Sequence, residues 1–353
     1  MNKPRLLVLS PGFPANERDS TCLPALRMFL KEEALREHFD IRIVSMHYPF
    51  HQRNYTWFGL PVMALGGKNK KGLFRIPLYL KTWAALRKNY GKDKTTLVLS
   101  IFATEAALLA SHFCRWHKLK HFCWVMGQDA GTNNPFHSLL ASPVRYLVMS
   151  EFLKQGLEHH SKRKAFGILP SALHVQDLPP YEVKNRTLDF ICVGSLIPLK
   201  RMEWVLQVVK DLKKEGIHAR ACIVGDGPER KALEELGLSF GISEQIHFTG
   251  EVQHTEVIAQ MLQSKILLHP SSYEGFGNVF LEALYSGCHV VSLFDPLNGK
   301  HPELHKVNSY PEFYSMAKTL LLSPINHACI QAITTKETAK LFIDFVQSAG
   351  NTK

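Results

Sequence analysis

Short apolar runs alternate with helical stretches along the chain, and this alternation limits the possible folds more than any other feature. Continuous apolar runs of this kind suit strands that are covered on both faces, as in a parallel sheet with crossover helices. In the second half the pattern predicts strands at Asp189–Val193, Ala219–Val224, Gln245–Thr249, Ile266–His269 and His289–Leu293. It predicts helices at Met202–Glu215, Pro228–Leu236, His254–Gln263 and Asn278–Ser286.

The first half repeats the scheme less clearly. Strands are expected at Arg5–Leu9, Ile41–Met46, Leu97–Phe102, Phe122–Met126 and Tyr146–Met149, with a helical stretch near Cys22–His38. A chain of 353 residues is long enough for two domains. We therefore expect an α/β protein with two Rossmann-like, doubly wound domains facing each other across a cleft. The expected parts are a domain at 1–172, a linker at 173–186, a domain at 187–330 and a closing helical segment at 331–353 that packs on the first domain.

The charge is unevenly distributed between the halves. The chain has a net charge of +11, made up of +13 in residues 1–185 and −2 in residues 186–353. An anionic partner of the first half is therefore expected: nucleic acid, a lipid surface or a phosphorylated substrate. No interleaved aromatic and basic motif occurs, so nucleic acid is not expected.

Other features bear on the compartment. No stretch reaches the roughly 18 apolar residues of a membrane span, and the apolar run after Lys3 and Arg5 is too short for a secretory signal. The seven cysteines include no C-x-x-C pair, which argues against a disulfide framework or a zinc ribbon. A cytoplasmic protein is expected.

One basic stretch, Lys68–Lys94, holds nine Lys and Arg residues against one Asp. Its apolar residues fall near one helical face: Ile76, Leu80, Trp83, Leu86 and Tyr90. We expect this face to pack on the first sheet and the basic flank to contact an anionic lipid surface or a phosphate. The protein would then be peripheral on the inner face of the cell membrane.

The most informative segment runs from Ser272 to Gly287. Its glycines allow a ligand to approach the backbone closely, and the helix that follows begins with free N–H groups. The amides of Gly277, Asn278 and Val279 are therefore expected to hold an anion, most simply a diphosphate. Glu274 before the helix and Glu282 inside it can each accept two hydrogen bonds from neighbouring hydroxyls, as on ribose or a sugar ring.

This segment resembles the donor-site signature of the retaining glycosyltransferases of family four. The matching residues are Glu274-Gly275-Phe276-Gly277, the second glutamate Glu282, and Ser286-Gly287. Flanking segments with family-like order and spacing are Val193–Lys200, Val224–Glu229 and Ile246–Gly250. The resemblance is strong over residues 187–295 and weaker over 1–170. It implies the GT-B fold.

The resemblance also implies roles for individual residues. Lys200 would neutralise the diphosphate, Glu282 would hold the ribose, and Glu274 would contact the transferred sugar. Ser195 stands where the family usually has arginine, and Arg201, where it often has glycine, either compensates or faces solvent. The implied donor-binding set is Gly12, Gly194, Ser195, Lys200, Arg201, Glu251, Val252, Gly275, Phe276, Gly277, Asn278, Val279 and Glu282.

Two residues of this prediction lie in the first half. Gly12 follows the first strand and would offer an amide near the reacting centre, or it forms a plain turn. Asp129 is either an acid or base near the reacting sugar or a helix cap. With Glu274 and Lys200 it completes the expected catalytic set.

The expected function is retaining, metal-independent transfer of a hexose from a nucleotide sugar to a saccharide or lipid-linked saccharide, in cell-envelope or capsular polysaccharide synthesis. No cofactor and no metal are expected. Two alternatives remain: a sugar-nucleotide epimerase on the same fold, and a basic non-catalytic module that binds membrane surfaces or nucleic acid. A dehydrogenase is disfavoured because Gly225-Asp226-Gly227 lacks the third glycine of a dinucleotide fingerprint.

Overall fold

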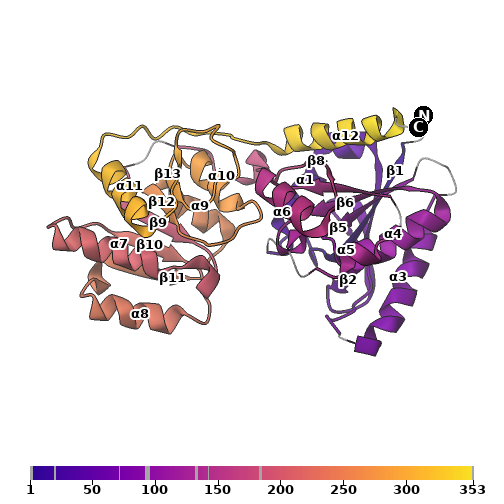
Figure 1. Ribbon diagram of the computed structural model, residues 1–353, viewed down its shortest axis with the longest axis horizontal. Helices are drawn as coiled ribbons and strands as arrows, with labels where there is room; N and C mark the ends of the chain where they lie inside the picture. Colours follow the sequence, from indigo (N-terminus) through magenta and orange to yellow (C-terminus); the bar gives the residue numbers. More distant parts are fainter. Residues whose placement is uncertain are drawn as a thin grey trace. The chain divides into compact units, whose positions relative to one another are not determined.

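The chain folds into two compact units in a computed structural model (Figure 1). The structure describes residues 3–19, 21–70, 72–91, 96–131, 134–141, 143–182 and 185–351. The first unit consists of Met1–His174 and Ile333–Lys353, and the second of Val175–Ala332. The boundary between His174 and Val175 falls inside the stretch expected to be a linker.

An eight-stranded sheet forms the centre of the first unit, in the order β3-β4-β2-β1-β5-β6-β7-β8. All neighbouring strands are parallel except β3 and β4. The strands are β1 (Arg5–Gly12), β2 (Asp40–Tyr48), β3 (Arg53–Trp57), β4 (Leu60–Ala64), β5 (Leu97–Ile101), β6 (Lys120–Val125), β7 (Val144–Val148) and β8 (Ala165–Ile168).

Seven α-helices accompany this sheet in the described part of the chain. The helical stretch expected near Cys22–His38 is divided at Glu32, which has an extended backbone. The helices are α1 (Pro24–Lys31), α2 (Glu33–His38), α3 (Ile76–Asn89), α4 (Glu105–His117), α5 (Phe136–Leu139), α6 (Glu151–Ser161) and α12 (Thr335–Asn351), with 3₁₀ turns η1 (Gly72–Arg75) and η2 (Gln128–Ala130).

The C-terminal helix α12 packs on the first unit (Figure 1). Phe342 of α12 is fully buried and makes ring contacts with Phe29, Phe39 and Phe122. The last segment of the sequence therefore completes the core that the first segment begins.

A six-stranded, fully parallel sheet forms the centre of the second unit, in the order β11-β10-β9-β12-β13-β14. The strands are β9 (Leu188–Val193), β10 (Ala221–Val224), β11 (Ile246–Gly250), β12 (Ser264–His269), β13 (His289–Ser292) and β14 (Leu304–Lys306). The helices are α7 (Glu203–Lys214), α8 (Arg230–Ser239), α9 (His254–Leu262), α10 (Asn278–Tyr285) and α11 (Tyr310–Leu322), with 3₁₀ turns η3 (Val175–Asp177), η4 (Pro198–Lys200) and η5 (Ser243–Gln245).

The strand order of the second unit reverses direction at β9. From β9 the chain moves outward to β10 and β11, and it then returns to β12 on the other side. Open parallel sheets bind ligands at such a switch point, beyond the carboxyl ends of the strands. The loops that follow β9 and β12 are therefore where a ligand site is expected.

No helix in the described ranges has the length and apolar character that crossing a membrane requires.

Candidate active site

The loops after β9 and β12 are joined by hydrogen bonds to one carbonyl group. The backbone N–H of Ser272 donates to the carbonyl of Leu199 over 2.9 Å, and the Ser272 hydroxyl donates to the same oxygen over 3.1 Å. This junction fixes the 3₁₀ turn η4 against the loop that carries Glu274. Lys200, the last residue of η4, is thereby brought to the Glu274 carboxylate.

Glu274 accepts two hydrogen bonds at one carboxylate oxygen, Oε1. Lys200 Nζ donates one, and His269 Nε2 donates the other over 2.8 Å. Burial alone would raise the pKa of Glu274, but the hydrogen bonds from His269 and Lys200 and the neighbouring positive charge outweigh it and lower that pKa to about 2. Glu274 is therefore an ionised carboxylate at neutral pH.

His269 is a functional candidate that the sequence analysis missed. It ends β12, is only 2% exposed, and packs its ring edge-on against Phe280. A carboxylate can only accept, so the proton of the neutral imidazole lies on Nε2; the other nitrogen, Nδ1, is buried without a hydrogen-bond partner. Burial lowers the pKa of His269 and so favours the neutral ring, although Glu274 acts in the opposite direction.

Helix α10 begins with a free N-terminus beside this group. Gly277 occupies the N-cap position with a φ of 78°, and no side-chain hydrogen bond caps the helix. Gly277, Asn278 and Val279 are half-buried. A Cβ on residue 277 would lie 2.6 Å from the Phe280 ring, so both conformation and space require glycine here. The first amides of α10 and the positive end of its dipole form a site suited to an anion.

Glu282 lies one turn further along α10, and its side chain is largely covered. The Nε2 atom of His254, the first residue of α9, lies 2.9 Å from Glu282 Oε1. This contact orients the Glu282 carboxylate. His254 was not predicted from the sequence, because the contact joins two helices 28 residues apart and leaves no local pattern.

The Gly-Asp-Gly motif after β10 has a packing role. A Cβ on Gly225 would lie 2.1 Å from the carbonyl oxygen of Gly194, and one on Gly227 would lie 2.4 Å from that of Leu196. The N–H of Leu196 donates to the Asp226 carbonyl over 2.9 Å. The glycines therefore allow the loops after β9 and β10 to pack backbone against backbone.

The remaining predicted donor-site residues of the second unit lie around these loops. Ser195 is exposed, and Arg201 has a left-handed backbone with a φ of 50°. The Arg201 guanidinium lies 5.5 Å from the centre of the Trp204 ring. At the carboxyl end of β11, Glu251 is exposed and Val252 is half-buried. Gly275 is half-buried and Phe276 is buried in the loop before α10.

Asp129 lies in the first unit, where its carboxylate organises a loop. It accepts hydrogen bonds from the backbone N–H groups of Ala103 and Gly127, each over 2.8 Å, and of Met126 over 3.2 Å. Burial raises the pKa of Asp129, although these hydrogen bonds oppose the shift. Asp129 and Gln128 also line a hollow of about 650 Å³ beyond β5 and β6.

Gly12 ends β1 in the same unit. Its backbone packs on Cys22 and Tyr48, and a Cβ there would make ordinary contacts of 3.4 and 3.5 Å with their side chains. Space alone does not require glycine at this position.

The expectation for the apolar face of the basic stretch is wrong for two of its residues. Ile76 and Leu80 are exposed, whereas α3 buries Leu78 and Leu86. The face that packs on the sheet follows a four-residue spacing, 78, 82 and 86, so it is rotated relative to the expected one. Of the basic residues in this stretch, Lys71, Lys92 and Lys94 lie outside the described residues.

Among the described residues, no group of three or more His, Cys, Asp or Glu side chains is placed to hold a metal ion.

Comparison with known proteins finds a family that resembles most of the second unit. Residues 177–296 match the family described as glycosyl transferases group 1. The gpi3 subunit of phosphatidylinositol N-acetylglucosaminyltransferase from Schizosaccharomyces pombe is 28% identical over 131 residues, which are 36% of this chain and 29% of that protein. The uncharacterized glycosyltransferase YqgM of Bacillus subtilis is 23% identical over 150 residues, 42% of each chain. The chain thus matches less than half the length of these curated relatives.

Solved structures resemble the fold over nearly the whole chain. The lipopolysaccharide outer core galactosyltransferase WaaB has a TM-score of 0.72 at 13% identity, covering 98% of this chain and 99% of that one. Anabaena HepE, solved with UDP and glucose, has a TM-score of 0.71 at 14% identity, covering 98% and 100%. Both likenesses concern the fold, which is of the GT-B type. Over residues 177–296, the chain is similar to the family of glycosyl transferases group 1.

Proposed function

We propose that the protein is a retaining glycosyltransferase that uses a nucleotide-sugar donor. One observation carries this proposal: the ionised Glu274, the cation Lys200 and the uncapped N-terminus of α10 meet at the switch point of the second sheet. This combination offers a site for a diphosphate and, beside it, a negative charge for the sugar that leaves. The match of residues 177–296 to the family of glycosyl transferases group 1 supports the same assignment.

The chemistry follows from the charges. The diphosphate would bind the amides of Gly277, Asn278 and Val279, and Lys200 would neutralise the charge that develops as the sugar departs. The ammonium of Lys200 is bound to Glu274 in the structure, so the donor must draw it away or share it. His269 would then keep the Glu274 carboxylate in place.

Glu274 would stabilise positive charge at the anomeric carbon during transfer. The acceptor hydroxyl would attack from the face that the phosphate leaves and lose its proton to that phosphate. Such front-face transfer retains the anomeric configuration. Because cations and helix amides absorb the developing charge, the proposed reaction needs no metal and no further cofactor.

The other predicted residues receive supporting roles. Glu282 would hold the ribose through the carboxylate oxygen that His254 does not contact. Backbone groups at Gly194, Glu251 and Val252 would line the base pocket. For Asp129 we propose a positioning role in the first unit, since its carboxylate already accepts three backbone hydrogen bonds.

Five further predicted residues complete the donor site. The backbone of Gly275 and Phe276 would shape the turn that leads the donor to α10. Ser195 and Arg201 would meet the outer edge of the diphosphate, and Gly12 would offer its amide near the reacting centre.

The acceptor is proposed to be a saccharide or lipid-linked saccharide of the cell envelope or capsule. Two names support this class. The gpi3 subunit belongs to a transferase named for phosphatidylinositol, and WaaB is named as a galactosyltransferase of the lipopolysaccharide outer core. We also propose that the protein attaches peripherally to the inner face of the cell membrane through the basic stretch Lys68–Lys94.

A donor panel tests the activity. Purified protein is incubated with UDP-, GDP-, ADP- and CMP-sugars, and NMR follows the anomeric configuration of any released or transferred sugar. Turnover of at least one donor with retention is expected. Absence of turnover with every donor would contradict the proposal, and isomerisation of the free nucleotide sugar without acceptor would identify an epimerase instead.

A single substitution tests the donor site. Glu282→Ala should weaken binding of the active nucleotide sugar about tenfold or more in calorimetry, because it removes a carboxylate from the ribose hydroxyls. Glu235→Ala, an exposed glutamate on α8, serves as the matched control and should bind like the wild type. Equal affinity of the two variants would remove Glu282 from the site.

A further inference from the structure

Four large apolar side chains are exposed on η1 and α3 of the first unit. Leu73 is 80% exposed and Phe74 76%, followed by Ile76 at 52% and Leu80 at 69%. A single exposed apolar side chain is ordinary, but four between residues 73 and 80, on one turn and the helix that follows it, indicate an interaction surface. We call these four residues the Leu73 patch.

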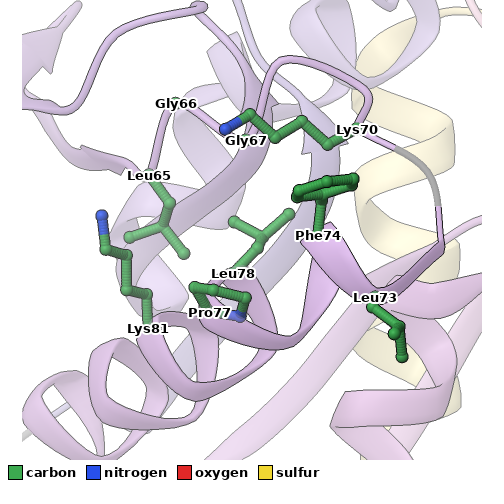
Figure 2. A pocket seen from close by; sticks show the side chains of 9 residues that line it. All are labelled: Leu65, Gly66, Gly67, Lys70, Leu73, Phe74, Pro77, Leu78 and Lys81. Atoms are coloured by element: carbon green, nitrogen blue, oxygen red, sulfur yellow. The ribbon is translucent and has the colours of Figure 1, made fainter.

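A hollow of about 410 Å³ adjoins the patch. Figure 2 shows the apolar side chains of Leu65, Phe74 and Leu78 grouped between Lys70 and Lys81, while Leu73 points away from them. The hollow therefore has an apolar floor and a cationic rim. This distribution matches a molecule with a hydrocarbon chain and an anionic head group.

The charge around the patch has one sign. No Asp or Glu occurs in the sequence between Asp40 and Asp93. Five basic side chains of this region are exposed in the described residues: Lys68, Lys70, Lys81, Arg87 and Lys88. Two copies of this surface would repel each other, whereas an anionic surface would attract it.

Polar contacts fix η1 and the start of α3, which carry the Leu73 patch. Arg75 donates through Nε to the Lys70 carbonyl over 2.9 Å, and its guanidinium lies 3.6 Å from Glu105 Oε2. Tyr79 donates to the same Glu105 oxygen over 2.9 Å, while His47 Nε2 contacts the other oxygen at 2.5 Å. The apolar side chains are thus presented to solvent by a well-anchored turn and helix.

From these observations we infer that the Leu73 patch docks onto a lipid bilayer containing anionic lipids. The four apolar side chains enter the hydrocarbon layer, the surrounding lysines and arginines contact the head groups, and the hollow receives a hydrocarbon chain. This inference deepens the membrane attachment proposed above and rests on that part of the proposed function. The inference adds insertion of the four apolar side chains to the attraction between charges.

Vesicle sedimentation tests the inference. Wild-type protein should bind vesicles of phosphatidylglycerol mixed with phosphatidylcholine, and Leu73→Ser/Phe74→Ser should bind about tenfold more weakly or worse, because two apolar side chains no longer insert. The matched control is Leu238→Ser/Leu322→Ser, since these leucines of the second unit are 67% and 60% exposed. It should bind like the wild type. Equal loss in both variants, or in neither, would overturn the inference.

Three further measurements separate insertion from other modes. Lys70→Gln/Lys81→Gln should weaken binding to the anionic vesicles, and wild-type protein should bind pure phosphatidylcholine vesicles much less. Phe74→Trp should show a blue-shifted emission that brominated lipids quench; emission unchanged by bound vesicles would overturn the inference. A dimer that Leu73→Ser/Phe74→Ser abolishes, in protein that does not bind vesicles, would identify a second copy as the occupant instead.

The membrane result is distinguishable from the donor result. Nucleotide-sugar binding to each variant is measured by calorimetry without vesicles, and the patch variants should bind donor like the wild type. Wild-type protein that binds donor but does not bind anionic vesicles would overturn the docking inference and leave the transferase proposal standing.

Discussion

At the residue scale, the candidate site depends on a buried histidine holding a carboxylate. Glu274 has two partners that differ in mobility: Lys200 reaches it on a long flexible side chain, while His269 is fixed in the core against Phe280. If Lys200 turns toward a diphosphate, His269 alone keeps Glu274 oriented and ionised. His269 is therefore a positioning residue rather than a reacting one.

Replacing His269 should change the titration of Glu274. The hydrogen bond from His269 is one of the interactions that lower the pKa of Glu274 from its ordinary value of 4.5 to about 2. His269→Leu removes this hydrogen bond but leaves Lys200 in place, so that pKa should rise by about one unit or more. Stabilisation from a lowered carboxylate pKa is present above the ordinary pKa and disappears as the pH falls through the folded-state pKa. The wild type should therefore lose this stabilisation between about pH 4.5 and 2, and His269→Leu at higher pH.

NMR of the Glu274 carboxyl carbon and thermal unfolding against pH measure the two effects. Each pKa unit corresponds to about 1.4 kcal/mol of unfolding free energy. His269→Gln, whose amide can donate in place of Nε2, should partly restore the wild-type titration. His247→Leu, at an exposed histidine of β11, is the control. An unchanged Glu274 titration in His269→Leu would show that Lys200 alone sets the pKa.

At the element scale, the alternation of strands and helices could be predicted because buried parallel strands leave continuous apolar runs. All five strands and four helices expected in the second half are present, with ends shifted by at most a few residues. Short β14 and the helix α11 were not predicted. In the first half the β3–β4 hairpin was not predicted; its turn residues Phe58 and Gly59 both have positive φ. Phenylalanine at such a position lacks the Asn-Gly or Asp-Gly signature of hairpin turns.

The candidate site could be predicted in part for a related reason. Glu274, Lys200 and the start of α10 belong to local motifs, so the sequence displays them. His269 and His254 act through contacts of their side chains with carboxylates elsewhere in the fold. Which face of α3 is buried depends on how its side chains pack against the sheet. Such relations exist only after folding, and a single sequence carries no pattern for them.

Close packing between the loops after β9 and β10 leads to a prediction at this scale. Gly225→Ala places a Cβ 2.1 Å from the Gly194 carbonyl, at a residue with a φ of 133°, so the two loops must separate. The unfolding free energy should fall by roughly 3 kcal/mol, from strain and overpacking together. Donor affinity should fall as well, because η4 and Lys200 follow the displaced loop.

The matched control is Gly216→Ala at the end of α7. Gly216 has a φ of 79° but open space around its Cβ position, so only backbone strain of about 1 kcal/mol is expected and donor affinity should not change. Denaturant unfolding and calorimetry give both quantities. Equal effects of the two substitutions would show that the contact between the loops does not determine the site.

At the scale of the whole molecule, the chain path determines which substitutions act on which unit. The second unit is one continuous segment, Val175–Ala332, inserted into the first. The first unit is completed only when α12 returns and buries Phe342 among rings from the start of the chain. Stability of the first unit therefore depends on the last helix, whereas Glu274, Lys200 and the start of α10 all lie in the second unit.

Reciprocal core substitutions test this separation. Phe342→Ala and Phe313→Ala each remove a fully buried ring, in the first and second unit respectively, and each should cost about 3–5 kcal/mol. Hydrogen–deuterium exchange should then speed up mainly in the unit that carries the substitution. Because donor binding is assigned to the second unit, Phe342→Ala should retain nucleotide-sugar affinity and Phe313→Ala should reduce it. Faster exchange in both units from either substitution would mean that the two units unfold as one cooperative body.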